Sequence, residues 1–125
     1  MKQQIIIYLT LIFALSLFSA SAGAIGNTSM LASIMLNLNH YPSAAEKDKL
    51  RGVINDDTHS AYQKTIAQAM INMEHSASAA DKSKLKTIID DNSAPADERN
   101  LAAILYKLKH KPSSADKELL KSMIE

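Results

Sequence analysis

The chain has 125 residues, a formal net charge of +1 and no cysteine. This near-neutral balance argues against a dedicated nucleic-acid-binding protein, because such proteins carry an excess of basic residues. The missing cysteines exclude disulfide bonds and acylation at a lipobox cysteine. The length after the first apolar segment suffices for one domain with its own core.

The first 24 residues are typical of a secretory signal peptide. Lys2 supplies a short basic start, residues 5–18 form an almost unbroken apolar run, and small residues follow up to Ala24. The apolar run is shorter than the ~20 residues that a membrane-spanning helix needs. We therefore expect cleavage before Ile25, or alternatively after Ala22. The mature domain, 25–125, is then expected in the periplasm or outside a bacterial cell, with no stable membrane anchor.

A 35-residue period organises the rest of the chain. His40, His75 and His110 stand at this spacing, each within a similar stretch of sequence. A fixed period of this size is typical of stacked supersecondary units. We place the units at about 28–57, 58–92 and 93–125.

Each unit is predicted to form two helices. In the first half, apolar residues at i, i+3, i+4 and i+7 form the stripe of an amphipathic helix. They are Leu31, Ile34, Met35 and Leu38, then Ile66, Ala69, Met70 and Met73, then Leu101, Ile104, Leu105 and Leu108. In the second half, Ser43, Ser78 and Ser113 each stand three residues before an acidic residue, as in a helix-start capping box. The predicted helices cover 28–40 and 43–56, 60–75 and 78–91, and 95–110 and 113–124.

These elements predict an all-α fold of three tandem helix-turn-helix repeats, forming a short α-solenoid. The period and the helix pairs resemble the architecture of tetratricopeptide-type repeats. That family's Trp-Leu-Gly-Tyr pattern is absent, since the chain has no tryptophan, so no family is assigned and no function is carried over. The last helix has no capping helix after it, and Leu119 stands where Lys49 and Lys84 stand in the other units. This end face predicts a homodimer through the C-terminal helix.

The three histidines are interpreted as caps at the ends of the first helices, where a protonated ring suits the helix dipole. A shared metal ion is the alternative. Neighbouring helices pack ~8–10 Å apart, whereas zinc–nitrogen bonds are ~2 Å long, so one ion reaches all three only if the stack closes sharply.

We expect a non-enzymatic module that binds a protein or peptide, because stacked repeats create extended surfaces and no catalytic motif is present. The alternatives are metal or small-ligand binding at the histidine edge, and inhibition of, or immunity against, a secreted enzyme. No cofactor is predicted. The predicted partner surface comprises Asn37, His40, Asn72, His75, Tyr106, Lys107 and His110. A basic ridge for an anionic partner comprises Lys47, Arg51, Lys82, Lys86, Lys117 and Lys121.

Overall fold

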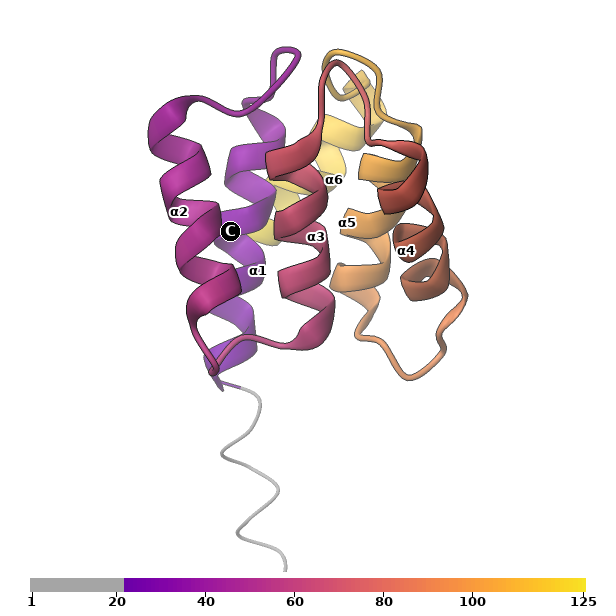
Figure 1. Cartoon of the computed structure of the whole chain (residues 1–125). Coiled ribbons are helices and arrows are strands. Elements are labelled where there is room, and N and C mark those ends of the chain that lie inside the picture. The colour runs from indigo at the N-terminus through magenta and orange to yellow at the C-terminus, as the bar shows by residue number, and fades with distance from the viewer. Residues whose placement is uncertain (1–21) are drawn as a thin grey trace, which may run out of the picture.

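The computed structural model describes residues 22–125, with side chains from Thr28 onward, and this part of the chain is all-helical. Its six helices are α1 (Ala22–Leu36), α2 (Ala44–Asn55), α3 (Ala61–Asn72), α4 (Ala79–Asp90), α5 (Ala96–Lys107) and α6 (Ser114–Ile124) (Figure 1). The predicted all-α class is confirmed. Most of the predicted signal peptide lies in 1–21, outside the described residues. Among the described helices, none has the length and apolar character needed to cross a membrane.

Serine side chains start the even-numbered helices, as the sequence predicts. Ser43, Ser78 and Ser113 each accept a hydrogen bond at 3.2 Å from the backbone N–H three residues later. At α2 the Glu46 carboxylate also accepts from the Ser43 backbone N–H at 2.8 Å, which completes a capping box. Each cap satisfies N–H groups that have no partner inside the helix, a contribution of about 1 kcal/mol.

The core is built from the predicted apolar stripes. All twelve stripe residues of α1, α3 and α5 and the turns that follow are buried, with exposures between 0 and 5%. Leu50, Leu85 and Leu120 of the even-numbered helices are fully buried against them. The alanine repeated in each unit (Ala32, Ala67, Ala102) is also fully buried, and its small side chain lets neighbouring helices approach closely.

The helices are packed so that the first and the last described helix meet. The odd-numbered helices α1, α3 and α5 contact one another, while α2 packs mainly against α3, α4 against α5 and α6 against α1 (Figure 1). An open stack would leave its first and last helices apart. Because α6 lies on α1, the last helix buries Leu120, whereas Leu119 is exposed.

The odd-numbered helices end earlier than predicted. They stop at Leu36, Asn72 and Lys107, three or four residues before the histidines. The C-caps of α3 and α5 are Met73 and Leu108, whose extended backbone carries buried side chains. The interpretation of the histidines as helix caps is therefore wrong. Burial of Met73 and Leu108 takes the chain out of the helix before the histidine is reached.

Candidate metal centre

Each histidine of the repeat occupies the tip of a tight turn. The loops that contain these turns join α1 to α2, α3 to α4 and α5 to α6, and they lie at the same end of the molecule, at the top of Figure 1. The two residues flanking each histidine form an isolated antiparallel bridge: Asn39 with Tyr41, Glu74 with Ser76, and Lys109 with Lys111. His40, His75 and His110 have φ angles of 74°, 69° and 66°. They are the only non-glycine residues with positive φ in the described part of the chain. This backbone conformation costs an L-residue about 1–2 kcal/mol, and glycine or asparagine usually occupies it.

A cycle of three backbone hydrogen bonds joins the turns. The N–H of His40 donates to the His110 carbonyl at 2.6 Å, that of His75 to the His40 carbonyl at 3.1 Å, and that of His110 to the His75 carbonyl at 2.6 Å. Each turn is therefore tied to both of the others through the backbone. The cycle gives hydrogen-bond partners to backbone N–H and C=O groups of the turns, which have none within the helices. It also holds the Cα atoms of the three histidines around a common centre.

The three imidazole rings converge at this centre. Nδ1 of His40 lies 2.8 Å from Nδ1 of His110 and 3.0 Å from Nδ1 of His75. Ring centroids are separated by 4.8–5.0 Å, with interplanar angles of 65–86°. One ring nitrogen from each histidine lies within 4.8 Å of the other two.

Hydrogen bonding alone does not satisfy this arrangement. A ring nitrogen has one in-plane position, which carries either a proton or a lone pair. Nδ1 of His40 faces two other Nδ1 atoms at hydrogen-bond distance, so it can donate to one or accept from one. Three converging lone pairs are instead the donor set of a metal ion.

The spacing is close to that of a three-histidine metal site. Zinc–nitrogen bonds of ~2.05 Å at tetrahedral angles place the ligand nitrogens about 3.3 Å apart. The separations of 2.8 Å between His40 and His110 and of 3.0 Å between His40 and His75 fall short of this value by about 0.3–0.5 Å, and all three ring nitrogens lie within 4.8 Å of one another. Small rotations of the exposed rings of His75 and His110 close this difference without disturbing the core.

Some charges near the histidine centre favour a bound cation, and others disfavour it. The C-termini of α1, α3 and α5 lie at this end of the molecule and carry partial negative charge, which favours a cation, whereas the N-termini of α2, α4 and α6 lie at the same end and carry partial positive charge. The flanking residues carry one acidic side chain, Glu74, and two basic ones, Lys109 and Lys111. These three side chains are exposed, so solvent screens their effect on the ion.

The other predicted surface residues do not join the histidines. Asn72 Nδ2 donates to Asp81 at 3.1 Å, and Lys107 Nζ lies 2.9 Å from the Asp116 carboxylate. These contacts tie the end of an odd-numbered helix to the start of the next helix. Asn37 donates to the Ser33 carbonyl. Tyr106 is 38% exposed on α5, with Lys82 Nζ 5.9 Å from its ring centroid.

The basic ridge is not brought together. Its six residues stand on α2, α4 and α6, and no two of these described helices contact each other. Several of the charges are also paired within their own helix: Arg51 with Asp48, Lys86 with Asp90 and Lys121 with Glu118. The six residues are therefore distributed over three helices that do not contact one another.

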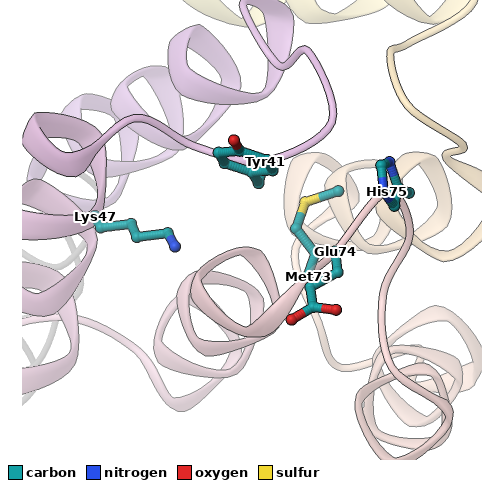
Figure 2. Close-up of a pocket in the computed structure, with 5 residues that line it drawn as sticks. All are labelled: Tyr41, Lys47, Met73, Glu74 and His75. Carbon is teal, nitrogen blue, oxygen red and sulfur yellow. The ribbon is translucent and has the colours of Figure 1, made fainter.

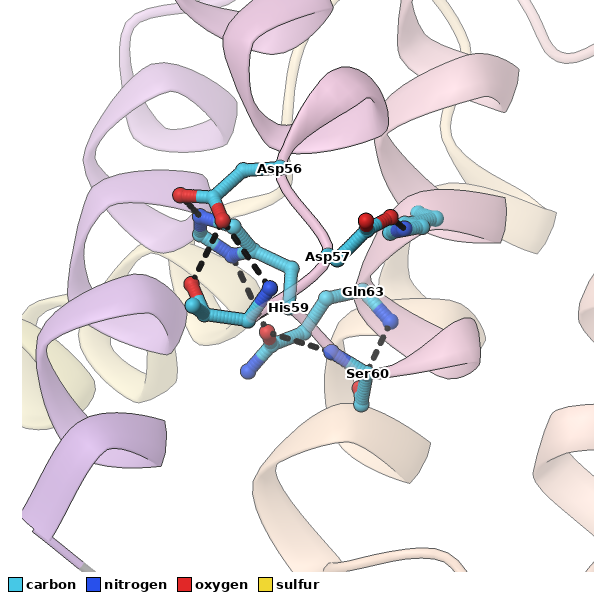
Figure 3. Close-up of polar contacts among 7 residues, drawn as sticks. Asp56, Asp57, His59, Ser60 and Gln63 are labelled. Carbon is cyan, nitrogen blue, oxygen red and sulfur yellow. Dashed lines mark hydrogen bonds and ion pairs between the residues drawn. The ribbon is translucent and has the colours of Figure 1, made fainter.

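A polar cluster at the opposite end of the helices has a structural role. Asp56 accepts from the Thr58 backbone N–H at 2.9 Å, which lowers the pKa of the Asp56 carboxyl. Ser60 and Gln63 form a capping box at the start of α3, and His59 Nδ1 lies 3.2 Å from the Gln63 amide oxygen (Figure 3). These contacts satisfy a helix start and a turn.

The sequence contained a signal for the histidine centre, namely the identity of the residue in all three copies. What it lacked was the closure that brings the copies together. Comparison with protein-family models, with curated proteins and with solved structures finds no match to this chain.

Proposed function

We propose that this chain is an exported protein that binds one divalent transition-metal ion through His40, His75 and His110. The observation that carries the proposal is the approach of Nδ1 of His40 to both other Nδ1 atoms, at 2.8 and 3.0 Å. Export is supported by the signal-like segment 1–24. Partner-protein binding stays a prediction from the sequence.

The strained backbone supports the same function. Among residues 22–125, three adopt positive φ, all three are histidine, and all three direct a ring to one centre. Asparagine or glycine would occupy these turns at lower cost in free energy. Strain that is kept at three equivalent positions favours a role for the side chain beyond folding.

We further propose that the threefold repeat itself forms the metal site. Three helix-turn-helix units arranged in a closed ring, rather than in an extended solenoid, bring three equivalent turns to one axis. Packing of α6 on α1 and mutual contact of α1, α3 and α5 support this arrangement. One histidine per unit then suffices for a three-ligand centre, and no second ligand per unit is needed.

The donor set indicates the class of metal. Imidazole suits zinc, copper, nickel and iron, and the absence of cysteine removes the thiolates that select soft ions. Three protein ligands leave a tetrahedral ion with a fourth position for water or another ligand. Because His75 and His110 are exposed, this fourth position faces solvent. The site therefore suits uptake and release of an ion better than a closed structural centre does.

Metal titration of the purified protein tests the proposal. We expect one Zn²⁺ or Cu²⁺ per chain by calorimetry and by elemental analysis after dialysis. His75→Asn should abolish binding while keeping the turn, because asparagine tolerates positive φ. His59→Gln is the matched control, since this fourth histidine lies in the polar cluster of Figure 3 and should not affect the stoichiometry. Unchanged binding in His75→Asn contradicts the proposal.

A further inference from the structure

The two short separations between ring nitrogens fit an octahedral ion. Nδ1 of His40 lies 2.8 Å from Nδ1 of His110 and 3.0 Å from Nδ1 of His75, and one nitrogen of each ring lies within 4.8 Å of the other two. Nitrogens bound at ~2.1 Å lie about 3.0 Å apart at octahedral angles and about 3.3 Å apart at tetrahedral angles. Three histidines on one side of an octahedral ion leave three coordination positions open on the opposite side.

Further ligands reach such an ion from the outer side of the histidine centre. The side chains two residues before the histidines, Leu38, Met73 and Leu108, belong to the buried core. On the outer side the rings of His75 and His110 are exposed, and the Glu74 side chain extends away from the His75 ring (Figure 2). This side of the centre is therefore open to a ligand as large as a second protein.

The three turns around the centre differ in charge. The second turn carries Glu74, the third carries Lys109 and Lys111, and the first carries the uncharged Asn39 and Tyr41. All five side chains are exposed. Among the described residues, no ion pair involves Glu74 or either of the two lysines. The end of the molecule thus presents an unpaired acidic turn beside an unpaired basic turn.

A second copy of this chain carries the complementary pattern. A twofold axis relates two identical surfaces, so every contact between two different residues occurs twice. Such an axis can bring the acidic turn of each copy beside the basic turn of the other. Glu74 then meets Lys109 and Lys111 of the second copy, in two equivalent sets of contacts. The three histidines of the second copy come to the open side of the ion in the same arrangement.

We propose that two copies of this chain share one octahedral ion, Ni²⁺ being the probe, and that each copy supplies His40, His75 and His110. This inference rests on the proposed metal function. Six imidazole nitrogens complete the coordination, and the contacts of Glu74 with the lysines of the second copy orient the two chains. Tetrahedral Zn²⁺ has one position left after three histidines, so it stays on a single copy.

Sedimentation and native mass spectrometry at one Ni²⁺ per two chains test the inference. We expect a species of two chains and one ion, which returns to the monomer when a chelator removes the nickel. X-ray absorption at the nickel edge should show six nitrogen ligands at ~2.1 Å. The Zn²⁺-loaded protein should remain monomeric at the same chain concentration.

Charge variants test the arrangement of the two copies. Glu74→Lys should raise the dissociation constant of the nickel-bound dimer roughly five- to thirtyfold at low ionic strength, because attractive contacts become repulsive. Glu74→Lys combined with Lys109→Glu and Lys111→Glu exchanges the charges of the two turns and should restore the dimer. Lys84→Glu, at an exposed position on α4, is the matched control and should leave the dimer unchanged. Zn²⁺ calorimetry of each variant measures any effect on the centre of a single copy.

The outcomes separate the two proposals. If neither Zn²⁺ nor Ni²⁺ binds, the metal function fails and this inference fails with it. If Ni²⁺ binds but the chain stays monomeric at one ion per two chains, only the shared site is refuted. A dimer that persists with chelator or in His75→Asn also refutes the shared site, because its interface would not need the ion. Equal dimer affinity in the native protein, Glu74→Lys and Lys84→Glu refutes the contacts of Glu74 with the second copy.

Discussion

Replacing a histidine of the centre by glycine should abolish metal binding without lowering the stability of the metal-free fold. His75→Gly removes one metal ligand and leaves a residue that adopts a φ of 69° without strain. If the histidines are kept for metal binding, the variant should lose the metal but fold at least as stably as the metal-free native protein. Function and stability then change in opposite directions, as is common at functional sites.

The magnitude follows from the backbone. Positive φ costs an L-residue about 1–2 kcal/mol, and glycine avoids this cost. Glycine also lowers the stability by about 0.5–1 kcal/mol, because its backbone has more entropy in the unfolded chain. The His75 ring is exposed, so the loss of its edge-on contacts with the other two rings subtracts little. We expect the metal-free variant to gain between about 0 and 1 kcal/mol in free energy of unfolding.

The assay is urea unfolding with a chelator present, followed by helical circular dichroism. A gain of 1 kcal/mol would raise the melting temperature by about 4–8 °C in a domain of this size. Ser83→Gly, at an exposed position inside α4, is the control and should lose about 0.5 kcal/mol, as glycine does in an ordinary helix. A loss of more than about 1 kcal/mol in His75→Gly would show that the ring itself holds the fold together. The inference from strain to function would then be refuted.

Three further predictions concern the rest of the molecule. Burial raises the pKa of the Glu98 carboxyl, so the contribution of this group to the free energy of unfolding is fully present at acid pH and is lost as pH rises through its folded pKa. Glu98→Gln should therefore raise the urea midpoint of unfolding at pH 7 and have little effect on it near pH 4. The Tyr62 hydroxyl donates to Asp91 at 2.7 Å and lowers the pKa of that carboxyl, so Tyr62→Phe should move the Asp91 pKa back toward its usual value in an NMR titration; an unchanged value contradicts the contact. Leu101 is fully buried, and Leu101→Ala should cost about 2–5 kcal/mol by urea unfolding, whereas Leu119→Ala, at a position 38% exposed, should cost well under half as much; equal losses would argue against the packing of α5.

Local sequence patterns predicted the helices well, because their causes are local. The serine caps act on N–H groups three residues away, and the apolar stripes follow the helix period. Ser43, Ser78 and Ser113 accept the expected hydrogen bonds, and the stripe residues are buried as expected. The helix ends were predicted less well, because burial of Met73 and Leu108 stops α3 and α5 before the histidines are reached.

The basic ridge shows that a repeat pattern does not predict how equivalent residues of successive units lie relative to one another. Lys47, Lys82 and Lys117 stand at equivalent positions in the sequence, and in a straight stack they would form one line. The helices that carry them do not contact one another, so the line does not form. A surface pocket lined by Tyr41, Lys47, Met73, Glu74 and His75 was not predicted for a related reason. Its wall combines Lys47 of α2 with the turns after α1 and α3, and no sequence spacing relates Lys47 to the turn after α3.

The sequence by itself determined the helical class, the buried faces, the starts of α2 to α6 and the threefold recurrence of a histidine. The start of α1 was predicted wrongly, because this helix begins at Ala22 and not at residue 28. Only the tertiary structure decided that His40, His75 and His110 meet at one centre. The physical reason is that the angle between successive units depends on how side chains of different units pack, which no local pattern records. In this chain that packing places α6 on α1 and joins the three turns by backbone hydrogen bonds. Residues that are 35 positions apart in sequence thereby come within 3.0 Å.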